Sequence, residues 1–166
     1  MPDLLTHAGI GVLLRSRAPR SALVWFAVGS CLPDLASRLP GLGLALLSWL
    51  TGVPVSLPVL EATGLCHMPL PYLVLCVLVA LLLPRPTRTT AFLNLWIAGW
   101  LHLFLDTLQR HLNGGYTLLY PFSLRRMELG LIENDASLRV APLLALALVA
   151  VLGWRAYRGL RRPPAT

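Results

Sequence analysis

The sequence contains no lysine, few acidic residues and no paired cysteine motif. Its 14 Lys and Arg residues are all arginine, they face only 7 acids, and charged residues make up 13% of the chain. The arginines lie in short clusters between apolar runs, which argues against nucleic acid as a partner and is typical of a membrane surface. Cys31, Cys66 and Cys76 lack the short paired spacing of a zinc ribbon or redox motif, which argues against a disulfide framework.

Several catalytic signatures are also missing. The sequence has no Gly-rich phosphate loop, no Gly-x-Ser-x-Gly nucleophile elbow and no Cys/His pairing for covalent catalysis. A cleavable signal is not indicated either, because Asp3 precedes the first apolar stretch, His7 interrupts it and the arginines follow it. We expect the N-terminus to remain in the mature protein.

Apolar residues dominate what remains. The hydrophobic fraction is 56% and the mean hydropathy is +0.69, above the usual range of soluble proteins. These values predict an all-α integral membrane bundle of about five membrane helices. The predicted helices are 4–16, 20–33, 69–84, 91–108 and 138–157. A further apolar stretch, 41–60, is interrupted by Gly52, Pro54 and Pro58, which predicts a re-entrant or interfacial hairpin.

The charges suggest an orientation for this bundle. If 41–60 returns to the side it left, nine arginines fall on one side without any acid, and all seven acids fall on the other with the remaining five arginines. The positive-inside rule then makes the all-arginine side cytoplasmic. We expect one transmembrane helical domain, 1–157, with an outward loop at 109–137 and an Arg-rich cytoplasmic tail at 158–166.

The candidate chemistry lies at the outward end. His102 and Asp106 are four residues apart, so they share one face of an apolar helix and can ligate one metal ion. His7, Asp34 and His67 lie at the same expected level, and the five side chains form a mixed nitrogen and oxygen set that suits a divalent metal, Zn²⁺ or alternatively Mn²⁺. The alternative is a structural His–Asp hydrogen bond between helices.

The outward loop offers groups for substrate capture. Arg110, Arg125 and Arg126 carry guanidinium forks that suit phosphate oxygens, although each can instead pair with an acid of the same loop. Gln109 and His111 are candidates for orienting groups or a proton relay. Asp34 and Asp106 are the first candidates for a general base.

Three short sequence motifs resemble those of a known protein family. They are Thr6-His7, Leu32-Pro33-Asp34, and the His102-x-x-x-Asp106 element followed by Gly115, Leu118-Leu119 and Pro121. In this order they resemble the family of membrane-bound metal-dependent hydrolases that includes the inner-membrane protein YdjM, described as LexA-binding; the last mark is also similar to a helix of zinc-dependent phospholipase C enzymes. The resemblance implies a bacterial inner-membrane location, with His7, Asp34, His67, His102 and Asp106 as metal ligands.

The chain departs from the family pattern at two places. Ala36 stands where the family often has a second acid, and the family's His-Arg-Gly-x-Thr-His-Ser element is represented only by the segment that begins at His67. One histidine is therefore missing, which weakens the case for a second metal ion and for hydrolysis.

The leading functional hypothesis is a metal-dependent hydrolase of an ester or phosphoester, lipid-linked if the site opens at the lipid–water boundary. The alternative is a non-catalytic membrane protein in which a structural metal or a His/Asp cluster stabilises the bundle or docks a partner. Metal or proton transport ranks last, because no inverted repeat is present.

Overall fold

The computed structural model describes residues 4–111, 114–133 and 136–160. Its elements follow one another as α1 (Leu4–Leu14), α2 (Arg20–Thr51), α3 (Leu57–Thr63), a 3₁₀ turn η1 (Gly64–His67), α4 (Pro69–Leu81), α5 (Arg85–Thr107) and α6 (Ala136–Leu160). Within the described residues the only β-type pairings are two isolated bridges in the loop before α6. The all-α prediction is confirmed.

Proline and glycine set most of the helix boundaries. α2 begins after Pro19, α4 begins at Pro69 and α5 begins after Pro84, positions where a missing N–H costs no helical hydrogen bond. Gly52 ends α2 in the left-handed conformation with φ of 69°, and its N–H donates to the Ser48 carbonyl. These residues explain why the chain breaks where it does.

The predicted end of the second helix at Pro33 is wrong. α2 continues through Pro33 and Pro40 to Thr51. Proline at position 33 cannot donate to the Gly29 carbonyl four residues earlier, but the Tyr72 hydroxyl lies 3.2 Å from that carbonyl oxygen and 2.8 Å from the Leu95 carbonyl oxygen, and its single proton is shared between them. This buried tyrosine from α4 partly satisfies the released acceptor, which lowers the cost of the proline.

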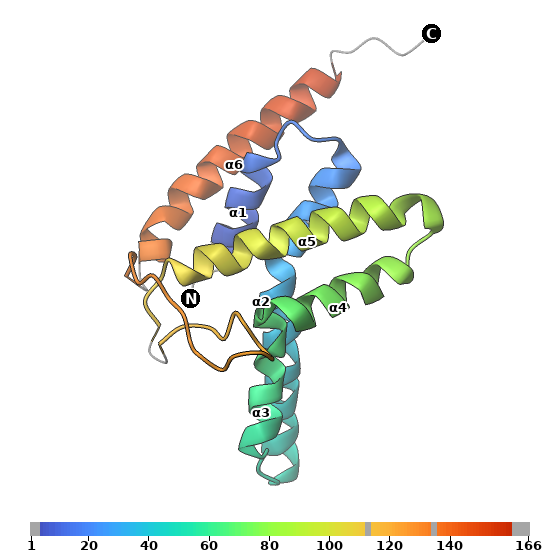
Figure 1. Cartoon of the computed structure of the whole chain (residues 1–166). Helices are drawn as coiled ribbons and strands as arrows, with labels where there is room; N and C mark the ends of the chain where they lie inside the picture. The colour runs from blue at the N-terminus through green and yellow to red at the C-terminus, as the bar shows by residue number, and fades with distance from the viewer. Residues whose placement is uncertain (1–3, 112–113, 134–135, 161–166) are drawn as a thin grey trace.

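The hairpin expected at 41–60 is present in a different form. Its first arm is the end of α2 and its second arm is α3, which runs back beside α2 after the turn that begins at Gly52 (Figure 1). We call residues 41–63 the α2–α3 hairpin. It projects from the rest of the molecule, so its leucines have few protein neighbours.

Three helices, α1, α2 and α4, pack against α5. α5 contacts α2 and α4, while α6 lies along α1 (Figure 1). Two glycines allow the close approaches, because a Cβ on Gly29 would meet the Leu95 backbone at 2.7 Å and one on Gly99 would overlap the Tyr72 ring. Tyr72, Cys76 and Leu95 are fully buried and form the centre of the apolar core.

By length and composition, two of the described helices can cross a bilayer. They are α2 and residues Arg139–Arg158 of α6. A third is added if Leu57–His67 and Pro69–Leu81, which meet at a 73° bend, form one broken span.

The chain is a helical membrane protein, but the arrangement of five membrane helices stays a prediction. The orientation also stays a prediction, and four residues of the expected charge pattern, Asp3, Asp135, Arg161 and Arg162, lie outside the described residues.

Candidate metal centre

The five predicted metal ligands come together in one buried cluster. His7 belongs to α1, Asp34 to α2, His67 to η1, and His102 and Asp106 to α5. Each side chain belongs to a residue that is at most 5% exposed. Sequence spacing alone links only the pair on α5, so the packing of α1 and α2 against that helix, and of η1 against α2, assembles the cluster.

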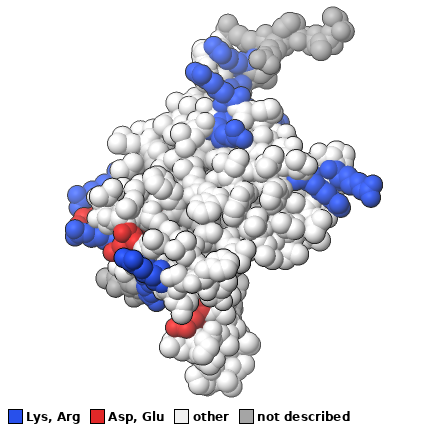
Figure 2. Space-filling model, viewed as in Figure 1, with Lys and Arg blue, Asp and Glu red and all other residues white. Residues whose placement is uncertain are grey.

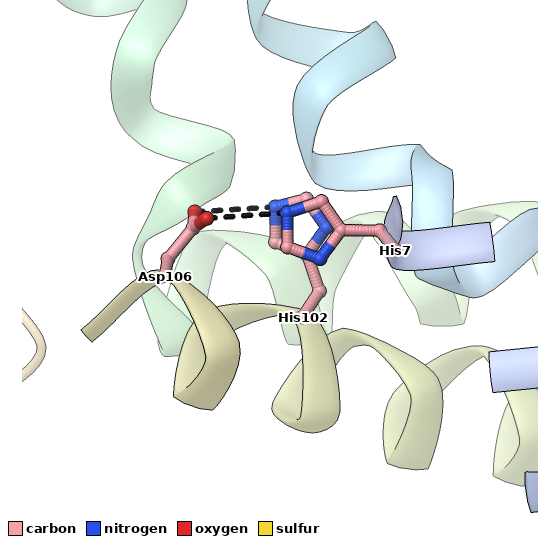
Figure 3. Close-up of side chains that lie close together, drawn as sticks. All are labelled: His7, His102 and Asp106. Atoms are coloured by element: carbon pink, nitrogen blue, oxygen red, sulfur yellow. Dashed lines mark ion pairs between the residues drawn. The ribbon is translucent and has the colours of Figure 1, made fainter. Parts of the chain in front are cut away.

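Asp106 lies at the centre of the histidines. Its Oδ1 is 3.2 Å from His7 Nε2, and its Oδ2 is 3.3 Å from His102 Nε2 and 3.9 Å from His67 Nε2. Figure 3 shows the His7 and His102 rings stacked, with both pointing at the carboxylate. The second carboxylate, Asp34, has Oδ1 3.3 Å from His67 Nε2.

The backbone fixes the orientation of His102. Its Nδ1 lies 2.7 Å from the Ser30 carbonyl oxygen, which can only accept a hydrogen bond. Nδ1 therefore carries the proton, and in the neutral ring Nε2 presents a lone pair to Asp106. Donation of the far ring N–H to a carbonyl is the arrangement that usually supports a metal-ligating histidine.

His67 is oriented by a short relay through Ser37. The Ser37 hydroxyl donates to the Pro33 carbonyl at 2.8 Å, so its oxygen is left to accept from His67 Nδ1, also at 2.8 Å. His67 Nε2 then presents its lone pair toward Asp34. Ser37 is a site residue that sequence analysis missed, and its position three residues after Asp34 on one helix face was the available signal.

The arrangement leaves acceptors facing acceptors. The two carboxylates and the Nε2 atoms of His7, His67 and His102 are buried and have no hydrogen bond of good geometry among the described residues, although Asp34 is also paired with Arg38 at 3.2 Å. Lone pairs that face carboxylate oxygens at 3.2–3.3 Å repel unless a proton or a metal ion lies between them.

The donor set fits a divalent ion, whereas protonation of both stacked rings at once would be unfavourable. The His7 and His102 rings are stacked with centroids 3.8 Å apart, where two positive charges would repel each other. Two groups have ligand atoms within 4.8 Å of one another: His7, His102 and Asp106, and Asp34, His67 and His102. Nitrogen and carboxylate ligands of this kind suit Zn²⁺ and Mn²⁺.

Tyr116 covers the cluster from the loop before α6. Its ring stacks on His67 with centroids 5.4 Å apart, and its backbone is paired with Met127. Gly115, at φ of 92°, permits this pairing, because a Cβ there would overlap the Met127 carbonyl. Burial, followed by the nearby charge of Asp106, raises the pKa of the Tyr116 phenol well above its usual range. Tyr116 therefore stays a neutral hydroxyl beside the cluster, and sequence analysis did not single it out as a site residue.

The predicted substrate-binding arginines lie at different places. Arg110 pairs with Glu133 at 3.0 Å, and both side chains are about two-thirds exposed, 65% and 67%. Arg125 is exposed, and only Arg126 lines the pocket beside His67. Arg38 lines the same pocket, and its Nε lies 3.2 Å from Asp34 Oδ1. Sequence analysis missed Arg38, although its spacing of four from Asp34 was a usable signal.

Gln109 and His111, the two candidates for orienting groups or a proton relay, have different surroundings in the structure. His111 lines the pocket and lies 3.4 Å, through Nδ1, from Glu128 Oε2. Gln109 is buried and its residue is bridged to Ile132. Neither belongs to the two groups whose ligand atoms converge.

Comparison with known proteins supports the family resemblance. The family model described as YdjM inner membrane protein matches residues 1–162. No curated protein and no solved structure matches the chain. Since the match covers nearly the whole sequence, the chain belongs to the YdjM inner membrane protein family.

Proposed function

We propose that the chain is a metal-dependent hydrolase of an ester or phosphoester at the extracytoplasmic face of the inner membrane. One observation carries the proposal: the lone pairs of His67 and His102, fixed by Ser37 and the Ser30 carbonyl, face the two buried carboxylates Asp34 and Asp106. A site prepared in this way favours a divalent cation. One residue of the site, His67, also lines a large pocket.

The ligands would come from the two overlapping groups, with His102 common to both. When bound, a divalent ion supplies Lewis acidity toward the ester oxygen and lowers the pKa of water. Asp34 is the better candidate for the general base, because its contacts Arg38 and His67 both line the pocket. Asp106 is enclosed by histidines, which suits a ligand.

The test combines metal analysis with turnover. Detergent-purified wild type, Asp106→Asn and a control, Glu133→Gln, are assayed for bound metal and for hydrolysis of a panel of carboxylic esters and phosphoesters. We expect about one ion or more per wild-type chain, turnover in wild type and the control, and loss of both in Asp106→Asn.

Two other outcomes would contradict the proposal. Protein purified without metal, and unable to take up Zn²⁺ or Mn²⁺, would mean that the cluster is a set of structural ion pairs. Bound metal without turnover on every ester would favour a structural metal, an alternative that the nearly complete burial of all five side chains also fits.

A further inference from the structure

A large pocket opens beside the cluster. It has a volume of about 1270 Å³ and lies between the α2–α3 hairpin, η1 and the loop that carries Tyr116. Small-molecule sites usually measure about 300–1,000 Å³. This pocket can therefore hold a ligand larger than a simple phosphate ester.

The walls of the pocket are of two kinds. Near the cluster they include His67, Ser37 and Arg38, and Arg126 and Glu61 supply the other charges. Arg38 and Arg126 place two guanidinium groups on this wall, a type of group that suits phosphate oxygens, and Arg38 also contacts Asp34. Leu42, Leu60 and Leu124 provide apolar wall further along.

The apolar part of the pocket wall is continuous with an exposed apolar surface. No charged residue occurs between Arg38 and Glu61, and Leu42, Trp49 and Leu50 of the hairpin are 66%, 79% and 66% exposed. Figure 2 shows the projecting hairpin as almost entirely uncharged, next to the patch where arginines and acids mix. In a membrane protein, such a surface contacts acyl chains.

We propose that this pocket binds a phospholipid from the surrounding bilayer, with its phosphate at Arg38 and Arg126 and an acyl chain along Leu42 and Leu60. One consequence rests on the proposed function: the bound lipid is the substrate of the hydrolase, and its phosphoester lies next to His67. Arg38 has the central part, because its guanidinium joins the pocket to Asp34 through the 3.2 Å contact.

Binding can be measured without turnover. Detergent-purified full-length protein is titrated with a short-chain phosphatidylglycerol, and bound lipid is counted by native mass spectrometry. We expect Arg38→Gln and Arg126→Gln each to weaken binding by roughly tenfold, the effect of losing a charge-assisted hydrogen bond. Arg20→Gln, at the far end of α2, is the control for general attraction of phosphate. Leu42→Asn should weaken binding, whereas Leu50→Asn, equally exposed but outside the pocket wall, should not.

Two further ligands identify what is recognised. A diacylglycerol with the same two acyl chains lacks the phosphate headgroup and should bind much more weakly, and inorganic phosphate lacks the chains and should compete only at high concentration. Equal binding of the diacylglycerol, competition by inorganic phosphate at the lipid's own concentration, or unchanged binding in Arg38→Gln would each overturn the proposal.

The metal-deficient variant separates this inference from the proposed function. Asp106→Asn should retain lipid, because Asp106 does not line the pocket. Lipid binding without any hydrolysis would leave the binding site in place and remove only the catalytic proposal. Hydrolysis of soluble esters without lipid binding would do the reverse.

Discussion

Replacement of Ser37 by alanine tests how His67 is prepared for a metal. In the structure the serine hydroxyl donates to the Pro33 carbonyl and accepts from His67 Nδ1, each at 2.8 Å. Without the hydroxyl, the neutral ring can move its proton to Nε2 and donate to Asp34, where Nε2 lies 3.3 Å from Oδ1. A ring in that tautomer has no lone pair at the metal-facing atom, so metal binding must first reverse the change.

The expected effect follows from one lost hydrogen bond. A buried N–H without an acceptor costs about 1–3 kcal/mol. At about 1.4 kcal/mol per factor of ten, this weakens metal binding by roughly 5- to 150-fold, and loss of a group that orients a metal-ligating histidine typically costs about 10–100-fold. The Kd for Zn²⁺ is measured in detergent by competition with a chromogenic chelator.

Ser30→Ala is the matched control. Ser30 also lies on α2, is buried and donates from its hydroxyl to the carbonyl four residues earlier, at 2.9 Å. Its contact with His102 is made by the backbone carbonyl, which the substitution retains. If Ser37→Ala and Ser30→Ala both bind Zn²⁺ as tightly as wild type, the argument from the histidine tautomer is refuted.

Three other predictions concern the centre, the packing and the orientation. His102→Ala should abolish metal binding measured by elemental analysis, whereas His7→Ala should leave one of the two ligand groups intact and retain some metal. Gly99→Ala should lower the free energy of unfolding by about 3 kcal/mol or more, because its Cβ would overlap an aromatic ring, whereas Gly153→Ala meets no neighbouring atom and should be neutral or slightly stabilising in thermal melts. In a variant without native cysteines, a cysteine at Arg158 should react with an impermeant maleimide only after the inner membrane is permeabilised; labelling of intact spheroplasts would contradict a cytoplasmic C-terminus.

The sequence predicted the cluster better than the path of the chain. The residues at 7, 34, 67, 102 and 106 could be selected because ionisable groups in apolar segments are costly and usually functional. The second helix was predicted to span 20–33, but it continues through Pro33 to Thr51. The Tyr72 hydroxyl from α4, distant in sequence, shares its proton between the released Gly29 carbonyl and the Leu95 carbonyl, which lowers the cost of the proline. A local pattern cannot reveal a partner that arrives from another helix.

Composition and spacing alone determined that the chain is a helical membrane protein, because apolar runs must satisfy their backbone internally, and that His102 and Asp106 share a helix face. Tertiary structure decided the rest. Only packing brings Ser37 to His67, the Ser30 carbonyl to His102 and Arg38 to the pocket wall. These contacts depend on the register of helices far apart in the sequence, and that register depends on close approaches such as the one at Gly29, which no local pattern encodes.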